Sequence, residues 1–315
     1  MRISLGIGGD VLSAPVPPRA VAAAAAAAED AGFPGAWATH FIRGTDSIPT
    51  ITAAGLITTE IELGIGVVPT YPRHPYTLAH EAATVQALIG GRLTLGVGVS
   101  HRPIMEGMLG LPFESPAEHM REYLQVLGTL LTTGQVSHHG RFFDVECGFD
   151  IPGTSPVSIL VGALGPRMVR VAGELSDGII TWLAGPRGLD KHIVPGLTEA
   201  AGAAGRGAPR IVVGLPVALA DRGKAEQAVN ETFARYGGLD NYRNQFEREG
   251  VTSPAELAVI GDEEAIRSHL AALRDAGATE ISAVVLPVGW DAAKSSNRTI
   301  ALLAELATEF APPAG

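Results

Sequence analysis

The chain has 315 residues, of which 46% are hydrophobic and 18% charged, so it is long and apolar enough to fold around a large core. Its net charge of −10 argues against nucleic acid or an anionic membrane as the main partner, so an anionic ligand would need local arginines, helix N-termini or backbone amides. The one cysteine, Cys147, excludes an intramolecular disulfide and a cysteine-based zinc site.

The alanine-rich run at residues 22–28 is expected to be a helix and not a secretion signal. No basic segment precedes it, and Glu29 and Asp30 follow it directly. No apolar run approaches the roughly 20 residues that span a bilayer. We therefore expect a cytoplasmic protein with no membrane partner.

Strands and helices alternate along the chain. Strands are expected at residues 3–7, 36–38, 61–67, 93–97, 157–161, 178–181, 211–219 and 281–286. Helices are expected at residues 18–31, 50–58, 76–88, 116–131, 166–175, 188–204, 224–236 and 263–276. Eight strands with helices between them predict a (β/α)8 TIM barrel, and we expect residues 1–315 to form that single domain.

Two segments are longer than ordinary barrel loops. Residues 132–155 are expected to contain a short hairpin around His138 and His139, and residues 237–258 are polar and partly helical. Each is either a lid over the site or a surface excursion.

Polar residues follow several strands where the strands end, and these ends face the same way in a parallel barrel. His40 follows the second strand and His101 the fourth, and either can move a proton near neutral pH. Arg73 and Arg102 come from the same mouth and could bind an anionic substrate or the acidic tail of a coenzyme. A structural salt bridge is the alternative for Arg73.

The fifth strand is followed by a small-residue turn, residues 162–165, and then by Pro166 in the first position of a helix. Free amides at that helix start favour an anion. The chain has no HExxH, GxSxG or clustered carboxylates, and we expect no metal site. A barrel without a metal set or a nucleophile needs an organic cofactor for redox chemistry.

The segments LGIGVVPTYPRHP and AHEAATVQALIGGRLTLGVGVSHRP resemble the luciferase-like monooxygenase superfamily, in the branch that uses the deazaflavin coenzyme F420. The resemblance continues through VGALGPRMVRVAGELSDGIITW and the GDEEAI region. It implies a homodimeric oxidoreductase that transfers a hydride between F420 and a small organic substrate. An FMN-dependent monooxygenase using oxygen and a non-catalytic flavin-binding relative are the alternatives.

The resemblance also implies the coenzyme contacts and a non-prolyl cis peptide at Gly66–Val67, as a bulge behind the ring. Thr39 stands where relatives commonly have Asp, and His101 where some have Glu, which weakens any mechanism needing a carboxylate there. Residues 105–113 and 237–258 are expected to select the substrate. The expected coenzyme contacts are Thr39, His40, Gly66, Val67, Val99, Ser100, His101, Gly162, Ala163, Leu164, Gly165, Thr181 and Trp182.

Overall fold

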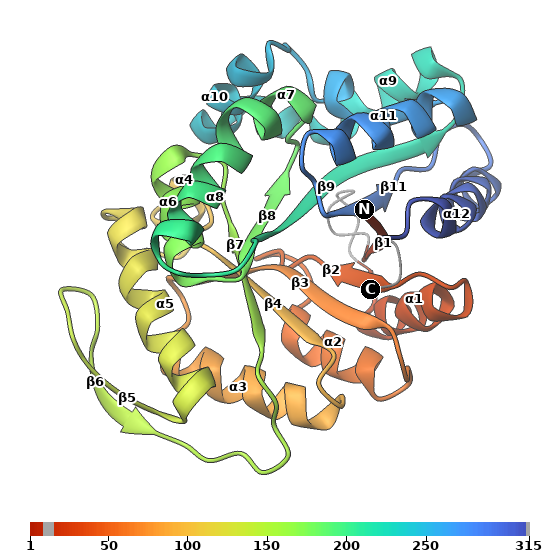
Figure 1. Cartoon of the computed structure of the whole chain (residues 1–315). Coiled ribbons are helices and arrows are strands. Elements are labelled where there is room, and N and C mark those ends of the chain that lie inside the picture. The colour runs from red at the N-terminus through yellow and green to blue at the C-terminus, as the bar shows by residue number, and fades with distance from the viewer. Residues whose placement is uncertain (9–15, 313–315) are drawn as a thin grey trace.

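A computed structural model describes residues 1–8 and 16–312 of the chain. Eight parallel strands form a closed barrel, in the order β9-β11-β1-β2-β3-β4-β7-β8, and β8 pairs with β9 to close the ring (Figure 1). This confirms the predicted (β/α)8 barrel. The strands are β1 (Arg2–Ile7), β2 (Gly35–Ala38), β3 (Glu62–Pro69), β4 (Leu93–Gly98), β7 (Ser158–Gly162), β8 (Gly178–Trp182), β9 (Arg210–Leu219) and β11 (Glu280–Val285).

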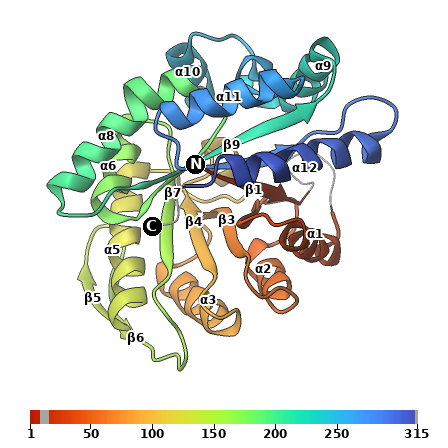
Figure 2. The same cartoon turned by 45° about the vertical axis from the view of Figure 1, so that its right-hand side comes forward.

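Helices surround the barrel on all sides, as the view turned by 45° also shows (Figure 2). The outer helices are α1 (Pro18–Asp30), α2 (Ser47–Gly55), α3 (Pro75–Leu88), α5 (Pro116–Thr133), α6 (Pro166–Leu175), α8 (Val194–Ala203), α9 (Arg222–Phe233), α11 (Glu263–Asp275) and α12 (Ala292–Glu309). Among the described residues, no helix is both long and apolar enough to cross a membrane.

Two kinds of local signal fix where the helices begin. Proline occupies the first turn of α1, α3, α5 and α6, where its missing N–H costs no hydrogen bond. Aspartate caps α2, α9, α11 and α12, and each carboxylate accepts a hydrogen bond from a backbone N–H of the first turn.

Helix α12, strand β10 (Val259–Gly261) and the short helix α4 (Arg102–Met105) were not predicted from the sequence. Helix α12 closes the eighth βα unit, and the short strand β10 pairs with β9 beside the ring. Helix α4 follows β4, and α10 (Asp240–Glu249) forms the helical part of the second insertion.

The first insertion is a hairpin, as predicted, and consists of the antiparallel strands β5 (Gln135–His139) and β6 (Asp144–Gly148). Its turn is held by Glu122 of α5, whose carboxylate accepts hydrogen bonds from the backbone N–H groups of Arg141, Phe142 and Phe143. These bonds lower the pKa of Glu122 against the effect of burial. The hairpin is thereby anchored to α5.

The amino end of the barrel interior is filled by charged side chains. The guanidinium of Arg210 bonds to Glu62 and to the fully buried Glu280, and it lies 5.4 Å from the ring of Trp37. The Trp37 Nε1–H donates to Glu280 Oε1 at 2.8 Å. Above these groups Trp37 packs with Leu160, Val212 and Ile180. The floor of the barrel is therefore a packed core and not a pore.

Candidate active site

The carboxyl end of the barrel interior is lined by three glycines, Gly66, Gly98 and Gly162, which we call the glycine layer. They occupy inward-facing positions of β3, β4 and β7, since inward and outward residues alternate along each strand. A Cβ at Gly66 would lie 2.6 Å from Ile180, and one at Gly98 would lie 2.5 Å from Val67. The missing Cβ atoms therefore let Ile180 and Val67 pack against the backbone, and a flat ring at this end would rest on these two apolar side chains.

The predicted cis peptide at Gly66–Val67 is present, and the pairing register of β3 with β4 shifts between Ile65 and Val68. The resulting bulge turns the side chain of Val67 toward the glycine layer. Its methyl groups would lie 3.4 Å from a Cβ placed at Gly162. Val67 and Ile180 therefore pack against the glycine layer and make this end of the interior apolar.

His40 lies just past the end of β2, and its side chain is only 13% exposed. Its Nδ1 is 2.9 Å from the hydroxyl of Ser47 and accepts a hydrogen bond from the Ser47 backbone N–H at 3.4 Å. Because a backbone N–H can only donate, neutral His40 carries its proton on Nε2. Burial lowers the pKa of His40, an effect that the Asp46 carboxylate opposes and the Arg73 guanidinium reinforces.

Arg73 is engaged by two carboxylates. Its Nη2 lies 2.9 Å from Asp46 Oδ2, and its Nε lies 3.4 Å from Glu81 Oε2. This matches the structural salt bridge that the sequence left open as the alternative. A direct role of Arg73 in binding an anion stays a prediction.

Ser100 and His101 follow β4 at the same mouth. Ser100 has a φ of 61°, a left-handed conformation that non-glycine residues seldom adopt and that occurs often at functional sites. Burial lowers the pKa of His101, whose ring centroid is 5.8 Å from that of Tyr242. Val99 is half-buried against the core. Arg102 is exposed at the rim, where it pairs with Glu106 and lies 5.1 Å from the ring of Phe113.

Tyr242 belongs to α10, so the second insertion reaches across the mouth to the end of β4. It packs edge-on against Tyr236 at 4.6 Å, and Tyr236 packs in turn against Trp182 at the end of β8. On the far side, the guanidinium of Arg235 lies 5.6 Å from the ring of Phe41. These contacts connect the insertion and the turn before it to the ends of β2, β4 and β8, and its role as a lid stays a prediction.

The turn after β7 leads into α6, whose N-cap Gly165 makes no side-chain capping bond. A Cβ at Gly165 would meet nothing within 4 Å, so the helix start is open on that side. The carbonyl of Leu164 accepts a hydrogen bond from Arg248 of α10 at 2.9 Å, and Ala163 is buried. An uncapped helix start beside a guanidinium suits an anionic group.

The two predicted contacts on β8 face opposite ways. Trp182 is inward and lies over Gly214, where a Cβ would come 2.9 Å from the indole ring. Thr181 has the opposite orientation and is buried between the sheet and the helices, where its hydroxyl has no hydrogen-bond partner among the described residues. Thr39 is half-buried just past the end of β2.

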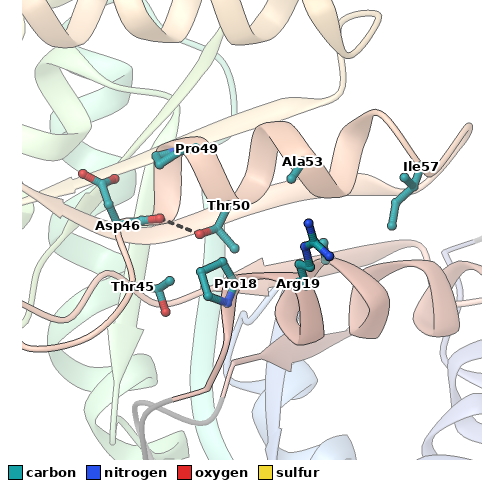
Figure 3. A pocket seen from close by; sticks show the side chains of 9 residues that line it. Pro18, Arg19, Thr45, Asp46, Pro49, Thr50, Ala53 and Ile57 are labelled. Atoms are coloured by element: carbon teal, nitrogen blue, oxygen red, sulfur yellow. Dashed lines mark hydrogen bonds between the residues drawn. The ribbon is translucent and has the colours of Figure 1, made fainter.

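A cavity of about 490 Å³ lies between α1 and α2, outside the barrel strands (Figure 3). None of its lining residues belongs to the glycine layer, so it is not the predicted coenzyme site. The Thr50 hydroxyl donates to the Asp46 carbonyl, while the Asp46 carboxylate points away from Ala53 and Ile57. The lining residues are Pro18, Arg19, Ala22, Thr45, Asp46, Pro49, Thr50, Ala53 and Ile57.

The family model described as luciferase-like monooxygenase matches residues 3–280 of the chain. The chain belongs to the luciferase-like monooxygenase family. The cis peptide, the glycine layer and the helical insertion are thus features of a luciferase-like barrel whose family the sequence predicted correctly.

Its curated relatives include two proteins named 5,10-methylenetetrahydromethanopterin reductase. The one from Archaeoglobus fulgidus is 28% identical over 305 residues, which cover 85% of this chain and 90% of that protein. The one from Methanopyrus kandleri is 32% identical over 209 residues, so this chain spans only 58% of its length. A protein named F420-dependent glucose-6-phosphate dehydrogenase, from Nakamurella multipartita, is 28% identical over 78% of this chain and 76% of its own length.

Solved structures share the fold at lower identity. The coenzyme F420 dependent tetrahydromethanopterin reductase of Methanopyrus kandleri has a TM-score of 0.79 and 23% identity, over 96% of this chain and 97% of that one. A monooxygenase from Streptomyces bottropensis has a TM-score of 0.78 and 22% identity, over 99% and 100%.

Sequence reasoning about this luciferase-like chain missed two residues beside its expected site. Asp46 lies six residues beyond His40 and comes back to it through a loop, and Tyr242 reaches His101 from an insertion. A capping Asp just before a helix is a readable signal for Asp46. No local signal in the sequence places Tyr242 near β4.

Proposed function

We propose that this protein is an oxidoreductase that transfers a hydride between the deazaflavin coenzyme F420 and a small organic substrate. Two observations support the proposal. One is the glycine layer with the apolar side chains packed against it. The other is a relative named F420-dependent glucose-6-phosphate dehydrogenase, which this chain matches over 76% of that protein's length. When bound, the coenzyme supplies or accepts the hydride at its central ring.

The residues at the mouth fit such a coenzyme. Gly66, Val67, Gly98 and Gly162 offer a flat apolar bed for a tricyclic ring. The uncapped start of α6 at Gly165 offers backbone amides to a phosphate-bearing side chain. Thr39, Val99, Ser100 and Trp182 would flank the ring and the start of that chain.

The chain's own chemistry lies in its histidines. Ser47 holds Nδ1 of His40, and Nε2 has no hydrogen-bond partner within residues 1–8 and 16–312. The doubly protonated ring can donate its proton from Nε2, and the proton that stays on Nδ1 is then bonded to the Ser47 hydroxyl. His101 is the second candidate, held against Tyr242 on the opposite side of the mouth. The covering insertion and the packed floor keep water away from the reacting atoms.

The experiment is an anaerobic titration of the purified protein with F420 and, separately, with FMN, followed by coenzyme fluorescence. We expect saturable binding of F420 and weaker or no binding of FMN. Tight binding of FMN alone, with oxygen-dependent turnover, would replace the proposal by the monooxygenase alternative. Binding without turnover across a panel of acceptors would favour a non-catalytic relative.

A matched pair of glycine variants locates the ring. In Gly162→Ala the added methyl would lie 3.4 Å from Val67, an ordinary contact that the fold tolerates, yet it would occupy the bed. Gly128→Ala in α5 meets nothing within 4 Å and is the control. We expect Gly162→Ala to weaken F420 binding about tenfold, roughly 1.4 kcal/mol, and Gly128→Ala to leave it unchanged. Equal affinities would remove the glycine layer from the site.

The functional unit that we propose is a cytoplasmic homodimer. The single Cys147 is consistent with a reducing compartment. The helices α2 and α3 lie side by side and expose Leu56, Ile57 and Leu88 at or just beyond their carboxyl ends, each more than half accessible. Apolar patches of this kind often mark an interface. Light scattering on the eluted protein tests the dimer.

A further inference from the structure

The mouth of the barrel also holds a carboxylate beside His40, which the proposed function does not use. Asp46 Oδ1 lies 3.7 Å from His40 Nδ1, although the two residues are separated by a loop. The residue before His40, Thr39, carries no charge, so the sequence leaves His40 without an acidic neighbour. The fold restores one from a different position.

Ser47, the residue after Asp46, bonds to His40 in either protonation state. Its hydroxyl can donate to Nδ1 of the neutral ring, or accept from Nδ1–H of the charged ring, at the same 2.9 Å. The Asp46 carboxylate would then stabilise the imidazolium. Protonation of Nδ1 removes the acceptor of the Ser47 backbone N–H, while the bond to the Ser47 hydroxyl is kept with its direction reversed.

The position of Asp46 is itself fixed from two sides. Its Oδ1 accepts the backbone N–H of Ile48 at 3.0 Å as the cap of α2, and its Oδ2 is held by Arg73 at 2.9 Å. Arg73 in turn contacts Glu81 of α3. Among residues 1–8 and 16–312, the charged groups that act on His40 are the Asp46 carboxylate and the Arg73 guanidinium, with Glu81 behind the guanidinium.

We propose that Asp46 is the positioning residue for His40, whose charged form it stabilises from 3.7 Å, while Arg73 limits that stabilisation. The role in catalysis rests on the proposed function, but the electrostatic pairing does not. The pairing would allow His40 to take up and release a proton near neutral pH although the ring is buried.

The test is an NMR titration of the His40 Cε1–H in the coenzyme-free protein, assigned with His40→Asn. Asp46→Asn removes the charge and keeps a side chain that caps helices well. We expect it to lower the pKa of His40 by about one pH unit, the effect of one charge at this distance in a water-like medium. Arg73→Gln is expected to raise it.

Glu81→Gln is the matched control. It also removes one negative charge that contacts Arg73, but Glu81 is not a direct neighbour of His40. If Asp46→Asn and Glu81→Gln shift the His40 pKa equally, or if Asp46→Asn shifts it upward, the pairing is refuted. Far-UV circular dichroism checks that each variant is folded.

A separate F420 titration of the same variants keeps the two proposals apart. A shifted His40 pKa with no F420 binding would refute the proposed function and retain the pairing. Normal F420 binding with an unshifted pKa would do the reverse.

Discussion

His40 combines burial with a fixed hydrogen-bond partner, which is unusual for a side chain at the mouth of a barrel. Its Nδ1 is fixed by the Ser47 hydroxyl and backbone N–H, and its ring is almost fully covered. Such fixation orients Nε2 before substrate arrives, and preorganised geometry is a large part of enzymatic rate enhancement.

We predict that His40→Ala lowers kcat with F420 by about 10²–10⁴-fold, the usual contribution of a positioned acid or base. The Kd of F420 should change only a few-fold, because the glycine layer and the start of α6 are left intact. Stopped-flow rates and a fluorescence titration measure the two quantities. Unchanged turnover in His40→Ala, with a large loss in His101→Ala, would assign the proton to His101.

At this scale the sequence predicted where the reactive side chains stand but not what surrounds them. A histidine that directly follows a strand must lie at the mouth, so His40 and His101 were accessible from the pattern alone. The partners Asp46 and Tyr242 depend on how a loop and an insertion fold back, and spacing along the chain does not encode that.

Among the elements, the loop after β3 is tied to α5 by an aromatic joint. Tyr71 stacks on His119 of α5 at 3.9 Å with nearly parallel rings, and His119 Nε2 lies 3.1 Å from the Thr70 hydroxyl. The Tyr123 hydroxyl donates to the Arg73 carbonyl at 3.0 Å. The joint fixes the loop that carries Arg73, and through it the position of Asp46.

This joint should make the protein sensitive to acid. Burial lowers the pKa of His119 to about 4, so the unfolded chain takes up a proton first as the pH falls below about 6.5. The contribution of neutral His119 to the free energy of unfolding is therefore full near neutral pH and is lost as the pH falls from about 6.5 to about 4. Allowing for solvent screening, we expect His119 to account for about 2 kcal/mol of that loss.

The variant His119→Gln keeps a partner for Thr70 and cannot be protonated in this range. Urea unfolding at pH 7 and pH 4.5 should show a smaller pH-dependent loss of stability than in the parent protein. Gly128→Ala in the same helix changes no titratable group and is the control, so it should retain the parent's pH dependence. A pH dependence unchanged in His119→Gln would contradict the assignment.

Element prediction succeeded where strand and helix periodicities were continuous and failed where they were short or mixed. All eight barrel strands were located within two residues of their ends, because buried strands form β-branched runs. The strand β10 has three residues, too few for a period, and α12 begins in a polar stretch that hides its apolar face.

Across the whole molecule, the two ends of the barrel interior differ in character. The amino end holds Arg210 between Glu62 and Glu280, and the carboxyl end holds the glycine layer. Glu280 is fully buried, so its charge is balanced by Arg210 and by the Trp37 N–H. The charged cluster stabilises the barrel, and Trp37 and Ile180 separate it from the glycine layer.

We predict that Glu280→Gln lowers the free energy of unfolding by about 2–3 kcal/mol, because it leaves the half-buried Arg210 incompletely paired. At a temperature where the variant is still folded, its affinity for F420 should be unchanged, since Trp37 and Ile180 separate Glu280 from the glycine layer. Chemical denaturation and a coenzyme titration measure the two effects. Glu263→Gln, at the exposed start of α11, should change neither, and weakened F420 binding in Glu280→Gln would show that the floor and the site are coupled.

The filled floor also governs the order of events at the proposed site. Because the amino end of the barrel is filled by packed side chains, coenzyme and substrate would both enter from the carboxyl end. A coenzyme on the glycine layer would lie deeper in the barrel than the substrate, so the substrate would have to leave first. We therefore expect F420 to bind before the substrate and to leave after it, an order that product-inhibition kinetics would test.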